Sequence, residues 1–488
     1  MKKIFYSIAT LSIILLTGCD NNTDTFNNNE DAPYDVSAES LLTNAEKELM
    51  DQMTTSSVNF SPFRYFTQYW AQTTYNDESR FSLNRRNVPQ NHWNTLYRNV
   101  LGNLASAKGV IASEVRPNDI SEADWTVKQQ NKVAIIEILQ VYTFQVLVDS
   151  FGDIPYTEAL NPEIKLPSYE DDAVIYPKLI IRLDAALAQL NADGSSFDTG
   201  DYLYEGDIMQ WKLFANSLKV KIGLNLADVD ATLAQSTVES GFTGGVILAN
   251  ADNTTFNYPG SAPNYNPVYA DLVASQRNDY TATTTFVNAL ESVNDPRIGI
   301  YYQANDGEYI GGVPGLSNVP YTAFSNIGDV FRSPNFPGQL FEATELNFYL
   351  AEAAARGYAV GNSAEYYYNQ AILLSFESWG LSALSADYLA QPAVAYATAA
   401  GDYKQKIGVQ AWYAFFNRPF ESWNSWRRLD FPSLVAPANA VSAADGEIPK
   451  RLTYPTNERT VNTTNYKAAV EAIGGADRLK VHVFWDKF

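Results

Sequence analysis

The sequence predicts a mainly α protein in which helical pairs form a frame that one long, loop-rich excursion interrupts. Apolar residues recur at helical spacing over most of the 488 residues. This spacing fades between about residues 241 and 339, where Gly, Pro, Asn and Tyr dominate. We therefore expect a single domain over residues 39–488. Its helical frame covers about 39–240 and 340–488, with the excursion at about 241–339 between the two parts.

The first 18 residues have the three parts of an export signal. Two lysines precede an apolar run over residues 4–16, and a small Thr-Gly pair then precedes Cys19. The run is shorter than the ~20 residues that a membrane-spanning helix needs. The sequence Leu-Thr-Gly-Cys resembles a bacterial lipobox, which implies cleavage before Cys19 and its lipidation. Acyl chains on Cys19 would anchor the chain to a membrane, and the alternative is a secreted protein with an incidental thiol.

The composition after the signal restricts the possible partners. Residues 19–38 are polar and poor in large apolar side chains, so we expect a flexible tether. The formal net charge of −21 repels nucleic acid, and we expect no nucleic-acid partner. His92 and His482 are the only histidines, which leaves little material for a His-based metal site or a Ser/His/Asp triad. We therefore expect no metal, no cofactor and no catalytic residues.

Three helices are predicted in the first part of the frame. Residues 127–148 are apolar nearly all round but carry Lys132, Glu137, Gln140 and Gln145, which favours a buried helix over a membrane span. Residues 173–190 keep helical spacing, and Pro177 is expected to kink or restart that helix. Asp207 is expected to cap a third helix that continues to about residue 227.

A helical hairpin is predicted where the second part of the frame begins. Small residues in 342–357 face small and aromatic residues in 363–380, at roughly the spacing of a tetratricopeptide unit of ~34 residues. Glu352 occupies the position where that repeat expects glycine, so a generic hairpin remains an alternative. The earlier helices are expected to add pairs to the same stacked frame.

Two charged motifs allow a functional or a structural interpretation. Asp149 and Asp153 in DSFGDIPYTEAL could form an acid and base pair, but a helix end followed by a turn is the favoured interpretation. The motif FNRPFESWNSWRRLDFPSL places Glu421, Arg427 and Arg428 among aromatic residues. A buried ion-pair network is favoured over a grip on an anionic ligand.

Six segments, in chain order, resemble motifs of the SusD/RagB family of outer-membrane nutrient-binding lipoproteins. The resemblance implies a SusD-like fold of tetratricopeptide-like helical pairs and exposure at the cell surface. It also implies a partner, a SusC-like TonB-dependent outer-membrane transporter on which the protein sits as a lid. Family members bind mostly glycans and some bind peptides. The segments are 149–160, 214–228, 343–357, 368–380, 406–434 and 448–470.

The family motifs describe the scaffold, so the candidate ligand residues rest on side-chain chemistry. Aromatic rings stack on sugar rings, and Asn or Arg side chains bond to neighbouring hydroxyls. Residues 64–86 and the excursion both offer this combination. Each residue alone more often packs locally, so the cluster is the hypothesis. The candidates are Trp70, Tyr75, Asn76, Arg80, Tyr265, Tyr269, Arg277, Tyr280 and Tyr309.

These observations predict a non-enzymatic receptor that captures oligosaccharides and delivers them to the transporter. Capture of peptides is the alternative within the same architecture. A surface glycoside hydrolase is a further alternative, and it would need two carboxylates ~5–9.5 Å apart across a cleft. An adhesin or structural surface subunit is the third alternative, and it predicts no saturable binding of a small ligand.

Overall fold

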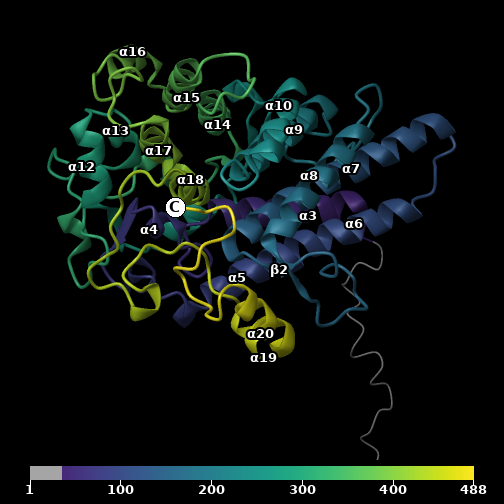
Figure 1. The fold of residues 1–488 in the computed structure, drawn as a ribbon, viewed down its shortest axis with the longest axis horizontal. Helices are drawn as coiled ribbons and strands as arrows, with labels where there is room; N and C mark the ends of the chain where they lie inside the picture. Colours follow the sequence, from purple (N-terminus) through teal and green to yellow (C-terminus); the bar gives the residue numbers. More distant parts are fainter. Residues whose placement is uncertain (1–35) are drawn as a thin grey trace, which may run out of the picture. The chain divides into compact units, whose positions relative to one another are not determined.

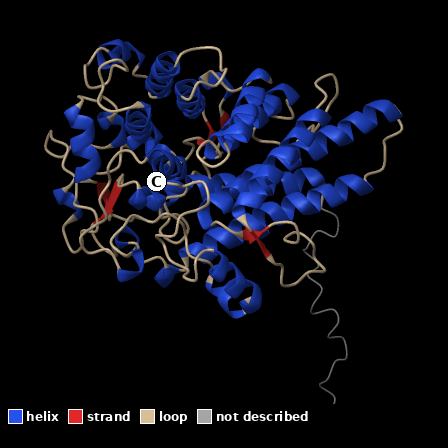
Figure 2. Ribbon diagram, in the orientation of Figure 1, coloured by secondary structure: helices blue, strands red, loops and turns tan. Residues whose placement is uncertain are grey.

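Helices dominate residues 36–488, the part of the chain that the computed structural model describes (Figures 1 and 2). Strands in this part form three short antiparallel pairs. The mainly α prediction is confirmed. The predicted export signal, Cys19 and most of the predicted tether lie outside the described residues.

Neighbouring helices pack as pairs, as the tetratricopeptide-like spacing predicted. Helices α8 and α9 also contact each other, as do α9 and α14, so the pairs join into one frame (Figure 1). The pairs are α3 (Ala38–Thr54) with α6 (Gly102–Ser113), α7 (Glu122–Phe151) with α8 (Asp172–Gln189), α9 (Ile208–Asn225) with α10 (Ala231–Thr243), α14 (Ala343–Ala355) with α15 (Ala364–Ser378), and α17 (Tyr403–Ala414) with α18 (Pro419–Leu429).

Local sequence explains how several of these helices begin. The Asp207 side chain accepts hydrogen bonds from the backbone N–H groups of Met209 and Gln210, which confirms it as the cap of α9. The expected restart at Pro177 is wrong, because α8 runs unbroken from Asp172 to Gln189. Pro177 lies in the second turn, where it removes one helical hydrogen bond. The buried face of α8 packs against α7 and α9 and keeps the helix continuous.

Helix α7 packs against α6, α8 and α9. Among the described helices it alone is long and apolar enough to cross a membrane, and 89% of its most apolar stretch is buried inside the protein. The prediction of a buried helix is therefore confirmed.

The segment between α10 and α14 is rich in loops, but it packs onto the frame instead of projecting from it. Its rings enter the core, where Tyr301 stacks on Phe416 at 4.3 Å and Phe286 stacks on the same ring at 5.7 Å. Aromatic burial holds this segment although its sequence lacks a helical period. Its elements are β4 (Thr254–Phe256), α11 (Pro267–Tyr269), β5 (Tyr280–Ala282), α12 (Thr284–Ser292), α13 (Ile298–Tyr301) and β6 (Gly338–Phe341).

Short elements complete the described chain. Strand β1 pairs with β5, in register Ala71 with Thr281, and this pairing ties the region after α3 to the loop-rich segment. Strand β4 pairs with β6, and β2 with β3. The remaining elements are α4 (Phe63–Phe66), β1 (Trp70–Gln72), α5 (Val88–Asn94), the π-helical turn at Thr95–Leu101, β2 (Ile154–Pro155), β3 (Tyr169–Glu170), α16 (Ser385–Leu389), α19 (Thr456–Thr460) and α20 (Thr463–Ala472).

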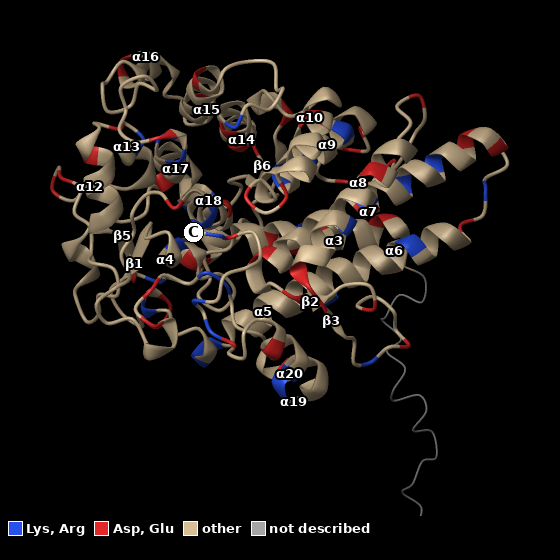
Figure 3. Ribbon diagram, viewed as in Figure 1, with Lys and Arg blue, Asp and Glu red and all other residues tan. Residues whose placement is uncertain are grey.

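The charged motif on α18 forms a buried network, as predicted. Lys221 Nζ lies 2.6 Å from a carboxylate oxygen of Glu421 and 3.6 Å from one of Glu345, and Arg418 pairs with Glu345. Elsewhere on the ribbon, acidic and basic residues are interspersed (Figure 3). These charged groups pair with one another inside the fold, so this network leaves no open site for an anion.

Asp149 in DSFGDIPYTEAL is a structural residue, as favoured above. It lies in the last turn of α7, and its buried carboxylate accepts hydrogen bonds from Trp485 Nε1 and Asn424 Nδ2, each at 3.0 Å, and from the Tyr176 hydroxyl. The chain then turns at Gly152, whose φ of +78° suits glycine. No acid and base pair is available at Asp149.

Candidate ligand-binding site

Three of the predicted ligand residues, Tyr75, Asn76 and Arg80, lie together in the segment that follows β1. We call the surface that these three residues form the Tyr75 surface. Tyr75 is 71% exposed, and its φ is +52°, in the left-handed region that non-glycine residues seldom adopt. Gln68, Phe81 and Asn87 share this conformation, so four such residues occur within 20 positions. Backbone strain of this kind concentrates at functional sites, which supports the choice of this loop.

Polar contacts from distant segments hold the Tyr75 surface in place. Asn76 Nδ2 and Asn439 Nδ2 both donate to the Gly315 carbonyl oxygen, at 2.7 and 2.8 Å. The Val441 N–H donates to the Arg80 carbonyl at 2.9 Å. An exposed ring on a fixed backbone loses little conformational entropy when it binds a ligand.

Charged groups surround the same loop. The Asp77 carboxylate lies 3.6 Å from Arg80, 3.1 Å from Arg85 and 3.5 Å from Arg86. Arg86 also lies 2.6 Å from Glu78. One carboxylate thus orients three guanidinium groups, whose remaining N–H groups are donors suited to sugar hydroxyls.

Trp70 and Tyr280 meet in the core, and the half-buried Arg277 lies beside Tyr280. The Trp70 and Tyr280 ring centroids are 5.5 Å apart, and the Arg277 guanidinium lies 4.8 Å from the Tyr280 ring. The exposed fractions of Trp70 and Tyr280 are 2% and 1%, so neither presents the open ring face that the prediction requires. The physical reason is the pairing of β1 with β5, which buries both strands.

The three remaining tyrosines lie apart from this core cluster. Tyr265 and Tyr269 are half-buried beside α11, and their rings meet edge to face at 5.2 Å. Tyr309 is half-buried in a separate cleft of about 380 Å³ that Gln303 and Asp329 also line. The nine predicted residues therefore form several groups, and the Tyr75 surface is the group with an open aromatic ring.

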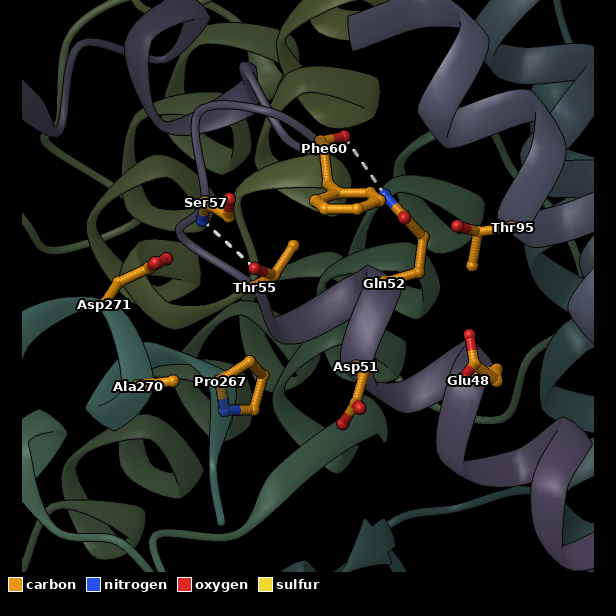
Figure 4. A pocket seen from close by; sticks show the side chains of 10 residues that line it. All are labelled: Glu48, Asp51, Gln52, Thr55, Ser57, Phe60, Thr95, Pro267, Ala270 and Asp271. Atoms are coloured by element: carbon orange, nitrogen blue, oxygen red, sulfur yellow. Dashed lines mark hydrogen bonds between the residues drawn. The ribbon is translucent and has the colours of Figure 1, made fainter. Parts of the chain in front are cut away.

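Two clefts that the sequence did not indicate lie along α3. The larger, of about 410 Å³, has the exposed ring of Tyr202 and the ring of Phe256 in its wall. The second, of about 280 Å³, is lined by Phe60, Asp271 and polar residues of α3 (Figure 4). Polar residues at helical spacing on α3 were the one sequence feature that pointed to these clefts. The residues that face α3 across the clefts come from distant segments, so the sequence did not reveal them.

Asp153, Asp171 and Asp172 form the acidic group most suited to a cation among the described residues, with carboxylate oxygens within 4.8 Å of one another. Burial, followed by the charge of Asp153, raises the pKa of Asp172 to about 7. All three carboxylates already accept backbone hydrogen bonds, from Asp172, Ala173 and Phe484. The group is explained by the capping of α8.

The packed helical pairs define a class of mainly α proteins with a frame of paired helices. Within this class the chain belongs to the SusD-like family, because the family model described as "Starch-binding associating with outer membrane" matches residues 29–455. The family comprises carbohydrate-binding proteins that associate with the outer membrane.

Solved structures share this fold. A chitin-binding protein has 24% sequence identity and a TM-score of 0.78, with 93% of this chain and 100% of that chain covered. A chitin-binding SusD homolog from Flavobacterium johnsoniae has 23% identity and a TM-score of 0.76, with 92% and 98% covered. A SusD homolog from Bacteroides uniformis has 23% identity and a TM-score of 0.77, with 92% and 99% covered. At this level of sequence identity, the comparison shows that the folds are alike and nothing beyond that. No curated protein sequence matches the chain.

Proposed function

We propose that this protein captures oligosaccharides outside the outer membrane, without cleaving them, and delivers them to a SusC-like TonB-dependent transporter. The observation that carries the proposal is Tyr75, an exposed ring on a strained and pinned loop beside Asn76 and Arg80. The family description as starch-binding and two fold neighbours described as chitin-binding favour a glycan over a peptide. Lipidated Cys19 would hold the folded part at the cell surface.

In the proposed mode of binding, the Tyr75 ring stacks on the apolar face of one sugar unit. The Asn76 side-chain oxygen accepts a hydrogen bond from a hydroxyl, while its Nδ2 group keeps the loop in place through Gly315. Arg80 supplies donors to a neighbouring hydroxyl. These groups bind and orient the sugar. They include no carboxyl group, so they do not supply the acid and base pair that glycoside cleavage needs.

Calorimetry of the chain from residue 20 onward tests the proposal, with maltooligosaccharides, chitooligosaccharides and short peptides as probes. We expect saturable binding of a glycan and a loss of about 1 kcal/mol or more for Tyr75→Ala, as for a stacked aromatic contact. Tyr366→Ala is the matched control, because Tyr366 is 45% exposed on α15.

Unchanged affinity of Tyr75→Ala would exclude this surface as the glycan site. Release of reducing ends by the wild-type protein would replace the receptor with a glycoside hydrolase, and saturable binding of peptides alone would replace the glycan with a peptide. Delivery is tested separately. The full-length protein should copurify with an outer-membrane transporter, and Cys19→Ala should leave the membrane fraction.

A further inference from the structure

The two clefts along α3 share one face of that helix. Residues at positions 40, 43, 44 and 47 line the first, and residues at 48, 51, 52 and 55 line the second. This spacing of three and four keeps them on one side of a helix. Positions 40 to 55 extend over about 22 Å at 1.5 Å per residue. Residues between 256 and 271 contribute to the lining of both clefts. Tyr202 completes the first cleft, and Ser57, Phe60 and Thr95 complete the second.

A polar bridge links the lining of the first cleft to that of the second. Lys47, which lines the first cleft, is 2.5 Å from Asp51, which lines the second. The Tyr258 hydroxyl donates to the other carboxylate oxygen of Asp51 at 2.9 Å. The two clefts follow one another along the same face of α3, and we call them together the α3 groove.

The first cleft of the α3 groove has the side chains that bind a sugar ring. Tyr202 is 56% exposed, and its ring lies 6.0 Å from that of Phe256. The amides of Asn44, Asn257 and Asn264 line the same cleft. Aromatic faces together with planar amides suit the apolar face and the hydroxyls of a pyranose.

Buried carboxylates fix the loop that presents Tyr202. The Tyr202 N–H donates to Glu46 Oε2 at 2.7 Å. Asp201 accepts from the N–H groups of Leu203, at 3.0 Å, and Gly206, at 2.9 Å, and from Trp211 Nε1 at 2.7 Å. The backbone at Tyr202 is therefore fixed before a ligand binds, as the backbone at Tyr75 is on its own loop.

The second cleft is acidic and has one aromatic wall. Glu48, Asp51 and Asp271 line it together with Phe60, which is 38% exposed (Figure 4). Asp271 accepts from Ser56 Oγ at 2.9 Å, and Asn99 donates to Glu48 at 2.9 Å, so both keep acceptor capacity. Among the described residues that line this cleft there is no lysine or arginine. Carboxylates beside a ring favour a protonated amine.

We propose that the α3 groove is a second glycan site, separate from the Tyr75 surface, that selects oligosaccharides of amino sugars. The Tyr202 cleft holds one pyranose ring, and the acidic cleft holds the protonated amino group of a unit further along the chain. The inference extends the proposed capture of glycans. The two surfaces share no lining residue, so each can be tested without the other.

Calorimetry with two probes of equal length tests the proposal: a glucosamine oligomer, which is cationic, and an N-acetylglucosamine oligomer, which is neutral. Tyr202→Ala should weaken binding of both probes at this site about fivefold or more. The double variant Glu48→Gln/Asp271→Asn should weaken only the glucosamine oligomer, by about fivefold or more, because only its amine pairs with the carboxylates. Glu365→Gln, an exposed acid on α15, is the matched charge control.

The outcomes separate the two proposals. If the wild-type protein binds no glycan, the proposed function fails. If it binds both probes and Tyr75→Ala alone abolishes binding, the proposed function stands and the second site is excluded. If Tyr202→Ala and the double variant both bind the glucosamine oligomer with wild-type affinity, the α3 groove is likewise excluded. A thermal melt of each variant shows whether it is folded before titration.

Discussion

The buried core around Trp423 and Trp485, which we call the centre, and the two proposed ligand surfaces contain similar aromatic and polar side chains. The centre buries its rings, whereas the surfaces expose theirs. At the centre, the Arg427 guanidinium lies 3.5 Å from the fully buried Trp423 ring and 4.7 Å from the Trp485 ring. At the surfaces, Tyr75 and Tyr202 are 71% and 56% exposed, on loops that buried polar groups hold in place. Aromatic content alone therefore cannot locate a binding site. In the two proposed surfaces, the ring has an open face and hydrogen bonds hold its loop in place.

The largest expected effect comes from the centre. Asp149→Ala removes the acceptor of Trp485, Asn424 and Tyr176, and it leaves Arg427 buried without that nearby charge. Leaving three buried donors without their acceptor costs about 1–3 kcal/mol for each donor, and about 3 kcal/mol or more together. We expect a loss of that size in the free energy of unfolding, measured by urea denaturation. A loss below about 1 kcal/mol, the size of an ordinary substitution, would contradict the structural role of Asp149.

Trp70→Ala provides the contrast with Tyr75, because both residues were predicted to stack on a ligand. Trp70 is buried against Tyr280 with Arg64 over its ring at 4.9 Å, so the substitution creates a cavity. We expect a loss of about 3–5 kcal/mol in the free energy of unfolding, as for other buried Trp to Ala changes. Urea denaturation measures this loss. If the Trp70→Ala protein were as stable as the wild type but bound glycan more weakly, Trp70 would be a ligand-binding residue, as the sequence predicted.

The sequence predicted the parts of this comparison that depend on local pattern. Periodicity located α7, α8, α9, α14 and α15, and side-chain chemistry identified the cap at Asp207 and the structural role of Asp149. Helix α12 was missed because nine residues carry too little periodic signal. The burial of Trp70 depends on pairing with Ala282, more than 200 positions away, which no local pattern reveals. The α3 groove was missed for the same reason, since its walls come from distant segments.

His92 makes the stability of the protein depend on pH in the acid range. Burial lowers its pKa to about 3, and its ring nitrogens contact Gln52 and Ser150. The unfolded chain takes up this proton near pH 6.5 and the folded chain does not, so stability falls as the pH drops below 6.5. The slope from this group is about 1.4 kcal/mol per pH unit down to about pH 3.

Nuclear magnetic resonance distinguishes the two histidines. The His92 ring signals should stay constant between pH 5 and 8. His482 should titrate above its ordinary range, because a hydrogen bond to Asp486 raises its pKa. Titration of His92 within that range would show that its site is open to water.

Glu46→Gln tests the support of the Tyr202 loop. Burial, and then the charge of Asp201, raises the pKa of Glu46 well above its usual range. The protonated form fits the folded state, so its contribution to stability is present at low pH and is lost as the pH rises through the raised pKa. Glutamine keeps an acceptor for the Tyr202 N–H and never ionises. The variant should therefore gain melting temperature at pH 8 relative to pH 5, whereas Glu365→Gln should not, and an equal difference at both pH values would exclude a raised pKa.

The smallest expected change in stability is that of Tyr75→Ala. The ring is largely exposed, so its removal should alter the free energy of unfolding by no more than about 0.5 kcal/mol. Alanine keeps a Cβ atom and meets the same left-handed φ of +52°, so the backbone strain at this position is nearly unchanged. Tyr75→Gly relieves that strain and should melt at the same or a slightly higher temperature while binding glycan as weakly as the alanine variant. If glycine restored the affinity, the loop conformation and not the ring would be the binding determinant.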